Sequence, residues 1–312
     1  MKVDLPTIKG FTFRLNYNQK FRFSGDEIKE SMRTLKECTG INVITIAFEA
    51  KQAEAHSDKI DYHSKYTPSD RELEELIEYA KELGLWVILK PMVNCLDGTW
   101  RAFINFFDLE VPCEPKWSNW FASYTEYILH YGEIAEKTGC KMLIIGCELV
   151  MTERKEKYWR DLIGKIRNTY HGLLTYNTDK YQEGEVIWWD ALDVISSSGY
   201  YPEDAWTENL ERIRMVAEKY KKPFFFAECG CPSRTGSSRI PNDWTLEGEL
   251  DYEEQSRYYE TMFRHCHKES WIRGLVCWDW ASDYMDEQIE NDGYSVYKKP
   301  ACDVIRKYYE NR

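Results

Sequence analysis

The chain has 312 residues, of which 43% are hydrophobic, so it is long enough to bury the core of one large domain or of two ordinary ones. Its 53 acidic residues outnumber its 41 Lys and Arg residues, and the net charge of -12 disfavours nucleic acid and anionic membranes as partners. Residues 1–10 have no apolar signal core, and no apolar run approaches the roughly 20 residues that span a bilayer. We therefore expect a cytoplasmic protein with a neutral or cationic ligand, provided that no signal segment has been removed.

Eight short runs, several of them apolar on both faces, are predicted to be strands. In chain order they are residues 9–13, 42–47, 86–90, 142–147, 173–176, 194–197, 223–227 and 274–278. Amphipathic segments typical of helices lie between them, at residues 69–83, 117–138, 155–170, 206–220 and 252–269. Strict alternation of strands and helices indicates an α/β fold with a parallel sheet, and its size matches a single (β/α)8 TIM barrel.

The helix at residues 69–83 has the clearest boundaries. Ser69 followed three residues later by Glu72 forms a capping box, and Gly84 is a typical residue for ending a helix. No internal repeat, low-complexity tract or linker rich in Pro, Gly or Ser interrupts the chain. We therefore expect one domain over residues 1–312.

Four long segments follow predicted strands, at residues 49–68, 94–116, 229–251 and 281–299. They contain the aromatic residues Trp100, Trp117, Trp244, Tyr284 and Tyr294. Segments that follow barrel strands overhang one face, so these aromatic residues are expected to wall a cleft. Because large barrels also place many aromatic side chains between helices and strands, we expect about half of them to belong to the core.

The ten cysteines follow no repeating spacing, and several lie inside apolar runs, where a free thiol packs as a small hydrophobe. This usage suits a reducing compartment. Cys229 with Cys231, and His265 with His267, come nearest to a metal-ligand pattern. The first pair lacks a matching second pair, and the second lies in a predicted helix, where positions i and i+2 do not share a face. We expect neither a structural metal nor a cofactor.

Two glutamates stand at the carboxyl ends of predicted strands. Glu148 follows residues 142–147 and Glu228 follows residues 223–227, and they are 228 − 148 = 80 positions apart. A charge at the end of a buried strand is costly, and the carboxyl ends of barrel strands open onto the catalytic face. A proton donor and a second carboxylate about 5 Å away suffice to hydrolyse a glycosidic bond with retention. The pair therefore predicts glycoside hydrolysis, with one glutamate protonated near neutral pH and the other ionised.

The chain resembles clan A glycoside hydrolases, and within them glycoside hydrolase family 113, whose known members are mainly β-1,4-mannanases. The similar pieces, spread over the whole chain, are Leu89-Lys-Pro-Met-Val93, Ile145-Gly-Cys-Glu-Leu149, Ser198-Gly-Tyr-Tyr-Pro202, Phe225-Phe-Ala-Glu228, Trp278-Asp-Trp280 and Tyr297-Lys-Lys-Pro-Ala301. Each piece is short, and only the set is specific. The resemblance implies a β-1,4-mannan or manno-oligosaccharide substrate, cleaved by double displacement without a cofactor.

The resemblance also implies roles for individual residues. Glu148, at the fourth strand, would be the acid/base, and Glu228, at the seventh, would be the nucleophile. Clan members commonly present a tyrosine hydroxyl to the nucleophile after the sixth strand, so Tyr200 or Tyr201 is expected to hydrogen-bond Glu228, with Tyr200 favoured. Trp278 matches the tryptophan beneath the −1 sugar, and packing within the barrel is the less favoured alternative.

The remaining polar residues near the strand ends have weaker assignments. Lys90 is expected either to reach a sugar hydroxyl or to neutralise nearby acids such as Asp97, and Asn94 is a candidate sugar-binding residue. Asp279 is expected to pair with a basic side chain. Glu153, five residues beyond Glu148, is expected to cap the next helix.

Cys147 is the main departure from the clan pattern. Many clan members carry an asparagine before the acid/base that hydrogen-bonds the sugar 2-hydroxyl, whereas a thiol is a weak donor. Either another residue binds that hydroxyl or the activity is weaker, and the axial 2-hydroxyl of mannose could require a different partner.

Three alternatives remain open from the sequence. Substrate identity depends on loops, so the same barrel could be a β-xylanase, β-glucanase or β-mannosidase. Cys147 is the one feature that would suit a catalytically idle barrel that binds oligosaccharides. A metal-dependent hydrolase is disfavoured because residues 9–13 contain no His-x-His motif.

Overall fold

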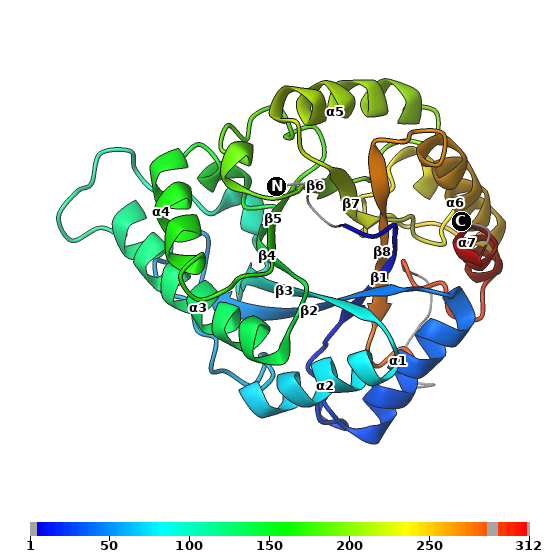
Figure 1. The fold of residues 1–312 in the computed structure, drawn as a ribbon, viewed down its shortest axis with the longest axis horizontal. Coiled ribbons are helices and arrows are strands. Elements are labelled where there is room, and N and C mark those ends of the chain that lie inside the picture. The colour runs from blue at the N-terminus through cyan, green and yellow to red at the C-terminus, as the bar shows by residue number, and fades with distance from the viewer. Residues whose placement is uncertain (1–4, 286–292, 311–312) are drawn as a thin grey trace.

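The computed structural model describes residues 5–285 and 293–310, in which eight parallel strands close into a barrel (Figure 1). The strands pair in chain order, and β8 closes the barrel by pairing with β1. They are β1 (Ile8–Arg14), β2 (Val43–Gln52), β3 (Trp86–Cys95), β4 (Met142–Cys147), β5 (Leu173–Thr178), β6 (Ile195–Ser198), β7 (Phe224–Cys229) and β8 (Ile272–Ala281). The predicted α/β barrel fold is confirmed.

Within the described residues, seven α-helices surround the barrel (Figure 1). They are α1 (Asp26–Thr39), α2 (Asp70–Glu82), α3 (Trp117–Thr138), α4 (Glu156–Ile166), α5 (Trp206–Tyr220), α6 (Tyr252–Cys266) and α7 (Pro300–Glu310). The crossover from β5 to β6 contains a 3-10 turn, Trp189–Ala191, in place of an α-helix. The sequence prediction did not name α1 or α7, although the buried Ile28, Met32 and Leu35 of α1 have helical spacing.

All five predicted helices are present, and α2 has the predicted capping box between Ser69 and Glu72. Gly84, the second residue after α2, has a left-handed backbone with φ 75°, as expected for a residue that ends a helix. Strands β2, β3 and β8 run several residues past their predicted ends. These extensions contain polar residues that face the mouth of the barrel, and such residues break the apolar pattern on which the prediction relied.

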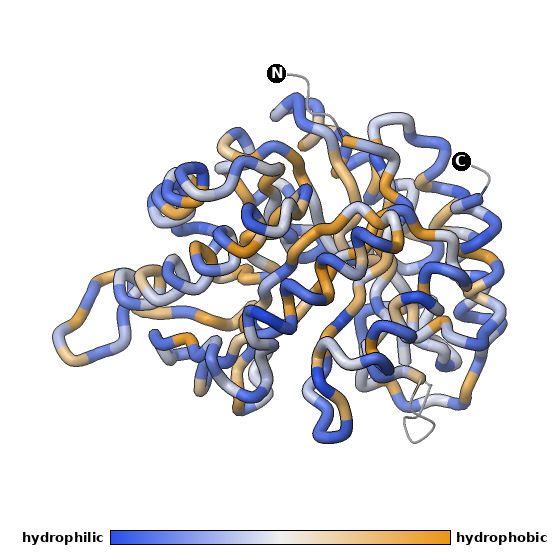
Figure 2. The backbone as a smooth tube through the Cα atoms, turned by 60° about the horizontal axis from the view of Figure 1, so that its bottom comes forward, coloured by the Kyte–Doolittle hydropathy of each residue, from blue (hydrophilic) through white to orange (hydrophobic). Residues whose placement is uncertain are grey.

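The barrel interior is apolar toward the amino ends of the strands. Leu5, Ile8, Ile88, Met142 and Phe225 belong to this inner cluster, and it is separate from the larger core between strands and helices. Figure 2 shows hydrophobic residues concentrated on the central strands, with hydrophilic residues on the outer turns. The polar residues at the other end of the barrel therefore lie above a closed apolar plug.

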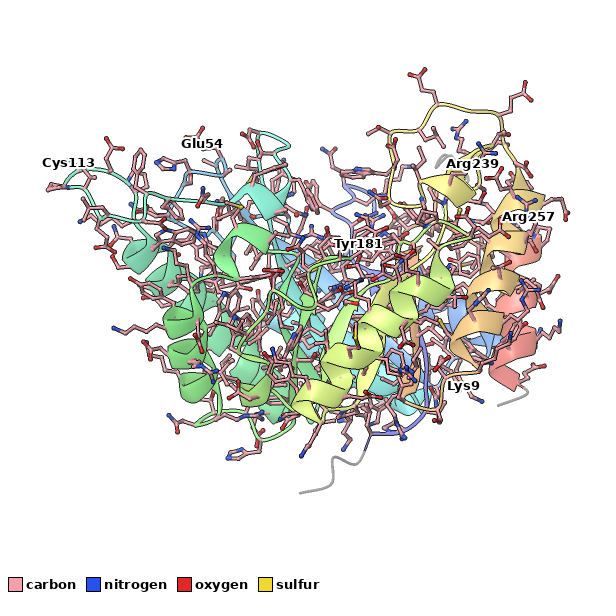
Figure 3. All side chains as sticks on the ribbon, turned by 90° about the horizontal axis from the view of Figure 1, so that it is seen from above. Lys9, Glu54, Cys113, Tyr181, Arg239 and Arg257 are labelled. Carbon is pink, nitrogen blue, oxygen red and sulfur yellow. The ribbon has the colours of Figure 1, made fainter. Side chains whose placement is uncertain are left out.

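The carboxyl ends of the strands point to the upper face in Figure 3. Lys9, near the start of β1, lies at the lower edge, and Glu54, just beyond β2, lies at the upper edge. Cys113 of the β3–α3 segment and Arg239 of the β7–α6 segment lie on opposite sides of that upper face. Two of the predicted long segments thus overhang the carboxyl face. Part of a third, residues 286–292 of the segment 281–299, lies outside the described residues.

None of the helices described is long and apolar enough to cross a bilayer. All ten cysteines are free, and Cys113 is the exposed one among them.

Candidate active site

Glu148 and Glu228 lie at the carboxyl end of the barrel, as predicted. Glu148 directly follows β4, whereas Glu228 is the last residue but one of β7, because β7 ends two residues later than expected. Their side chains are largely buried, since Glu148 is 6% exposed and Glu228 is 2% exposed. Two carboxyl groups so poorly hydrated require partners, and each glutamate has a different set.

Glu228 is held as an anion by three neighbouring groups. Its Oε1 pairs with the ammonium of Lys90 and lies 3.2 Å from Cys147 Sγ, and its Oε2 accepts a 2.8 Å hydrogen bond from the Tyr200 hydroxyl. Burial alone would raise the pKa of Glu228, but the charges of Lys90 and Arg101 and the hydrogen bonds of Lys90 and Tyr200 outweigh it, so the pKa is lowered. The predicted hydrogen bond from Tyr200 is confirmed.

Glu148 is held by an arginine and a serine. Its Oε2 accepts a 3.1 Å bond from Arg101 Nη2, and its Oε1 accepts a 2.7 Å bond from the Ser198 hydroxyl. Its backbone N–H donates to Asn177 O at 2.8 Å, and its φ is 51°, in the left-handed region that few residues with side chains adopt. Glu148 is therefore fixed both through its carboxyl group and through its backbone.

A hydrogen-bonded bridge of buried side chains joins the two glutamates. Lys90, which pairs with Glu228, also donates to Asn177 Oδ1 at 2.7 Å. Asn177 Nδ2 donates to the Ser198 hydroxyl at 3.0 Å, and that hydroxyl donates to Glu148. The Asn177 Oδ1 faces the Lys90 ammonium and its Nδ2 faces the Ser198 hydroxyl, so the neighbours fix the orientation of the amide.

Sequence reasoning missed Arg101, Asn177 and Ser198. Arg101 carried a signal, because it is a basic residue between Trp100 and Phe103 in a long segment after a strand. Asn177 is the last residue but one of β5 and Ser198 the last of β6, and both lie in polar stretches where an apolar pattern would otherwise be expected.

The two adjacent tyrosines point to opposite sides of the barrel wall. Tyr201 is fully buried outside the barrel, and its hydroxyl donates to Glu183 Oε1 at 2.7 Å beside Arg212. Tyr201, the less favoured candidate partner of Glu228 and a candidate substrate-binding residue, therefore faces away from the barrel mouth, and the expectation for it is wrong. Successive side chains of an extended chain face opposite directions, so only one of the pair can face the barrel mouth, and it is Tyr200.

Trp278 lies at the bottom of the barrel mouth. Its half-buried ring packs against Ala47, Met92 and Cys147, and Lys90 Nζ lies 5.5 Å from the ring centre. Cys147 joins this small cluster to the glutamates, because its Sγ lies 3.2 Å from Glu228 Oε1. The ring of Trp278 thus packs beside residues of the candidate site, and its role beneath the −1 sugar stays a prediction.

The other predicted residues have partners within the protein. Lys90 lies in the middle of β3, fully buried, and pairs with Glu228 and not with Asp97. Asn94 donates to Glu49 and accepts a 2.8 Å bond from Arg101 Nη1. Asp279, as predicted, pairs with a basic side chain, that of Arg14, and also accepts a 2.9 Å bond from Tyr284.

The predicted helix cap at Glu153 is wrong, because α4 starts after Lys155 and Glu153 points into the protein. The Glu153 Oε1 accepts hydrogen bonds from the hydroxyls of Tyr176, at 2.9 Å, and Thr178, at 2.8 Å. Burial raises the pKa of Glu153 to about 8, an effect that exceeds the opposing hydrogen bonds. Burial and the charge of Glu148 likewise raise the pKa of Asp179, next to Thr178, to about 7.

The raised pKa of Glu153 predicts how stability depends on pH. A folded-state pKa of about 8 against an ordinary 4.5 means that the folded state holds a proton that the unfolded state releases, so this group's contribution declines as pH rises from about 5 to 8. Glu153→Gln replaces the titrating carboxyl group with an amide that does not ionise. We expect wild type to lose stability relative to the variant as pH rises through that window. The difference between their free energies of unfolding, measured by urea denaturation, should change by up to ~1.4 kcal/mol per pH unit. A constant difference between the two proteins across the window would contradict the assignment.

Some of the aromatic residues predicted to wall a cleft are exposed, and others are buried in the core. Trp100 and Trp244 are 38% and 81% exposed, whereas Trp117 is buried and donates its indole N–H to Phe106 O. Two surface depressions, of about 720 and 1070 Å³, lie between neighbouring strand-following segments, but neither is lined by Glu148 or Glu228. Within residues 5–285 and 293–310, no cluster of three or more His, Cys, Asp or Glu residues is placed to hold a metal ion.

Comparison with known families gives one match over most of the chain. The model of Glycoside Hydrolase Family 113 matches residues 11–299. No curated protein matches the chain.

Solved structures give close matches over the whole fold. A GH113 β-1,4-mannanase solved as a complex is 51% identical, with a TM-score of 0.96, covering 99% of this chain and 100% of its own. The GH113 β-mannanase AaManA from Alicyclobacillus acidocaldarius is 40% identical, with a TM-score of 0.91, covering 99% and 98%. A β-glucuronidase from Ruminococcus gnavus, 15% identical with a TM-score of 0.67 and matched over 97% of this chain and 50% of its own, shares the fold alone.

Proposed function

The chain belongs to glycoside hydrolase family 113 and is a glycoside hydrolase, and we propose that it cleaves β-1,4-linked mannan or manno-oligosaccharides with retention of configuration. The substrate class is suggested by the similar structures, which are described as β-1,4-mannanases. The barrel, as one catalytic domain, supplies two glutamates with different hydrogen-bond partners at one end. No resident cofactor takes part in the proposed reaction.

In the first step, ionised Glu228 attacks the anomeric carbon while Glu148 gives its proton to the departing glycosidic oxygen. The bond to the leaving group breaks as the ester bond to Glu228 forms. The ion pair with Lys90 and the hydrogen bond from Tyr200 keep Glu228 ionised and fix the orientation of its carboxylate, as a nucleophile requires.

In the second step, water attacks the same carbon, Glu148 accepts the proton from that water, and Glu228 departs as a carboxylate. Lys90 is fully buried and loses its counter-charge while the ester exists. Regenerating the carboxylate beside a buried ammonium is favourable, so Lys90 assists the departure of Glu228.

The residues proposed to meet the sugar line the mouth around the glutamates. The ring of Trp278 would lie beneath the −1 sugar. Among the polar candidates, Asn94 and Lys90 are already hydrogen-bonded within the protein, so they act by holding Arg101 and Glu228. Cys147 lies between Glu228 and Arg101, where the sugar 2-hydroxyl is expected.

The observation that carries this proposal is the pair of buried glutamates at one end of the barrel, one bonded to a lysine and a tyrosine and the other to an arginine and a serine. Glu228 is bonded to a buried lysine that keeps it ionised, and Glu148 follows the fourth strand on the same face. The test is product analysis on matched manno-, xylo- and cello-oligosaccharides, with NMR of the first anomer released. We expect cleavage of manno-oligosaccharides with the β-anomer formed first. Activity confined to xylosides or glucosides would overturn the substrate, and release of the α-anomer would overturn the mechanism.

Cys147→Asn tests how the chain departs from the clan pattern. The thiol is buried, with Sγ 3.2 Å from Glu228 Oε1 and 3.5 Å from Arg101 Nη2, so a larger amide would crowd both groups or leave a donor unpaired. We expect a loss of about 1–3 kcal/mol in transition-state stabilisation on mannosides, measured as kcat/KM. Matched glucosides serve as the control. Improved turnover of mannosides would show that the asparagine is compatible with this substrate and that Cys147 is not adapted to it.

A further inference from the structure

The backbone at Glu148 is a turn that must be held in place. Glu148 has a φ of 51°, and a residue with a side chain adopts this region only when neighbouring groups fix it. Its own N–H is bonded to Asn177, and the next N–H, that of Leu149, donates to the Tyr176 hydroxyl at 3.0 Å. The hydroxyl of Tyr176 is thus a direct support of the turn that carries the proposed acid/base.

Tyr176 has little freedom to move. Its ring lies across β4 at Gly146, where an added Cβ would come within 2.7 Å of the ring. Trp159 and Trp188 each lie 5.1 Å from the ring, centre to centre, and stack on one another. Gly146 is two residues before Glu148, so the glycine admits the tyrosine that supports the turn.

Glu153 lies behind Tyr176 and fixes its hydroxyl. The Glu153 Oε1 accepts from both Tyr176 and Thr178, and its backbone oxygen accepts from Trp188 Nε1 at 3.0 Å. Its Oε2 is buried with no hydrogen-bond partner among the described residues. An ionised carboxylate would leave a bare charged oxygen there, whereas a neutral acid carries its proton on Oε2 and accepts both hydroxyls on Oε1.

We propose that Glu153, as a neutral acid, and Tyr176 are positioning residues for Glu148, acting through the Leu149 N–H. The Tyr176 proton points to Glu153, so the oxygen presents a lone pair to Leu149. This inference rests on the proposed function, because it assumes that Glu148 protonates the leaving group. Neither residue bonds to the Glu148 carboxyl group, so their effect is on its placement.

Two single-hydroxyl variants separate positioning from simple destabilisation. Tyr176→Phe and Thr178→Val each remove one hydroxyl from the same Glu153 oxygen, but only Tyr176 also supports Leu149. General acid catalysis contributes about 10²–10⁴-fold, so a displaced acid is expected to cost at least about tenfold in kcat/KM on mannotetraose. The Tyr176 variant should show this loss, and it should lose under about threefold on 2,4-dinitrophenyl β-mannobioside, whose leaving group needs little protonation. Thr178→Val should stay within about threefold of wild type on both substrates.

Glu153 itself is tested by two substitutions in the same assay. Glu153→Gln keeps an acceptor at Oε1 and should retain activity, whereas Glu153→Ala should behave as Tyr176→Phe. Circular dichroism checks the folding of each variant. If Glu153→Ala does not fold, Tyr176→Phe, which removes only the hydroxyl oxygen, still tests the positioning role. Equal losses on the two substrates by Tyr176→Phe, or equal behaviour of the Phe and Val variants, would overturn the inference.

A parallel Glu148→Ala arm distinguishes failure of the inference from failure of the proposed function. If Glu148→Ala shows the selective loss on mannotetraose and Tyr176→Phe does not, the positioning role is wrong and the acid assignment stands. If Glu148→Ala itself shows no selectivity, the acid assignment is wrong, and the inference is overturned with it.

Discussion

Glu228→Ala is expected to lower the turnover of aryl β-mannosides by about 10⁴-fold or more, because loss of a nucleophile removes the covalent path altogether. The measurement is kcat on 2,4-dinitrophenyl β-mannobioside. Removing one partner of a buried ion pair also costs about 3–5 kcal/mol of stability, so folding must be checked by circular dichroism. A variant that is folded and keeps most of the wild-type rate would exclude Glu228 as the nucleophile.

Added azide or formate should restore part of the lost activity of Glu228→Ala and give a product of inverted configuration. The substitution opens space next to the buried ammonium of Lys90, which then has no counter-charge and attracts a small anion. A second change, Lys90→Met, should therefore weaken the rescue. Glu183→Ala is the matched control, since Glu183 is also a buried, ion-paired glutamate but bonds to Tyr201 and Arg212 outside the barrel. It should lose stability without showing any rescue by azide.

The fold was predictable because its signals are local and repeated. Runs such as residues 142–147 are too short and apolar for a surface helix, and Trp117–Thr138 and Trp206–Tyr220 have helical periodicity, so the alternation was readable. Strand ends were less predictable. Lys90 was expected to end a strand, but β3 continues to Cys95 because its polar residues face the mouth of the barrel and pair there.

The site was predictable only where residue type and strand position together limit the possibilities. A glutamate at the end of a buried strand has few structural uses, and a tyrosine after β6 has one neighbour able to accept its proton from inside the barrel. Arg101, Asn177 and Ser198 differ, because their importance depends on which strands lie side by side. The bridge from Lys90 through Asn177 to Ser198 joins β3, β5 and β6, and nothing in a linear sequence specifies that juxtaposition.

Glu153 illustrates the opposite error. A glutamate shortly before a helix is usually a capping residue, and the sequence gives no sign that this one turns inward. Burial beside Tyr176 and Thr178 follows from the way β5 packs against the turn after β4. The capping tendency of a glutamate near a helix start was therefore outweighed by the tertiary hydrogen bonds of Glu153 with Tyr176 and Thr178.

Glu148→Ala is expected to affect substrates according to their leaving groups. A 2,4-dinitrophenolate leaves without protonation, so glycosylation of Glu228 should remain within about tenfold of wild type, whereas cleavage of mannotetraose should fall by about 10²–10⁴-fold. The measurement is kcat/KM for both substrates, with the pre-steady-state burst of dinitrophenol reporting the first step. The second step also needs Glu148 as a base, so the glycosyl-enzyme should accumulate and the burst should be followed by slow turnover.

Azide should then speed the second step of Glu148→Ala, because an anion needs no base to attack the glycosyl-enzyme and is no longer repelled by the missing carboxylate. It would attack from the face that Glu148 occupied, opposite the ester, so the product should be the β-mannosyl azide with retained configuration. The stereochemistry thus differs from that expected for Glu228→Ala, in which azide replaces the nucleophile and inverts the centre. Arg101 makes the azide site favourable, since its Nη2 loses the Glu148 carboxylate as a partner. Equal losses on both substrates, or an α-azide from this variant, would mean that Glu148 is not the acid/base and that the left-handed turn at its backbone serves another purpose.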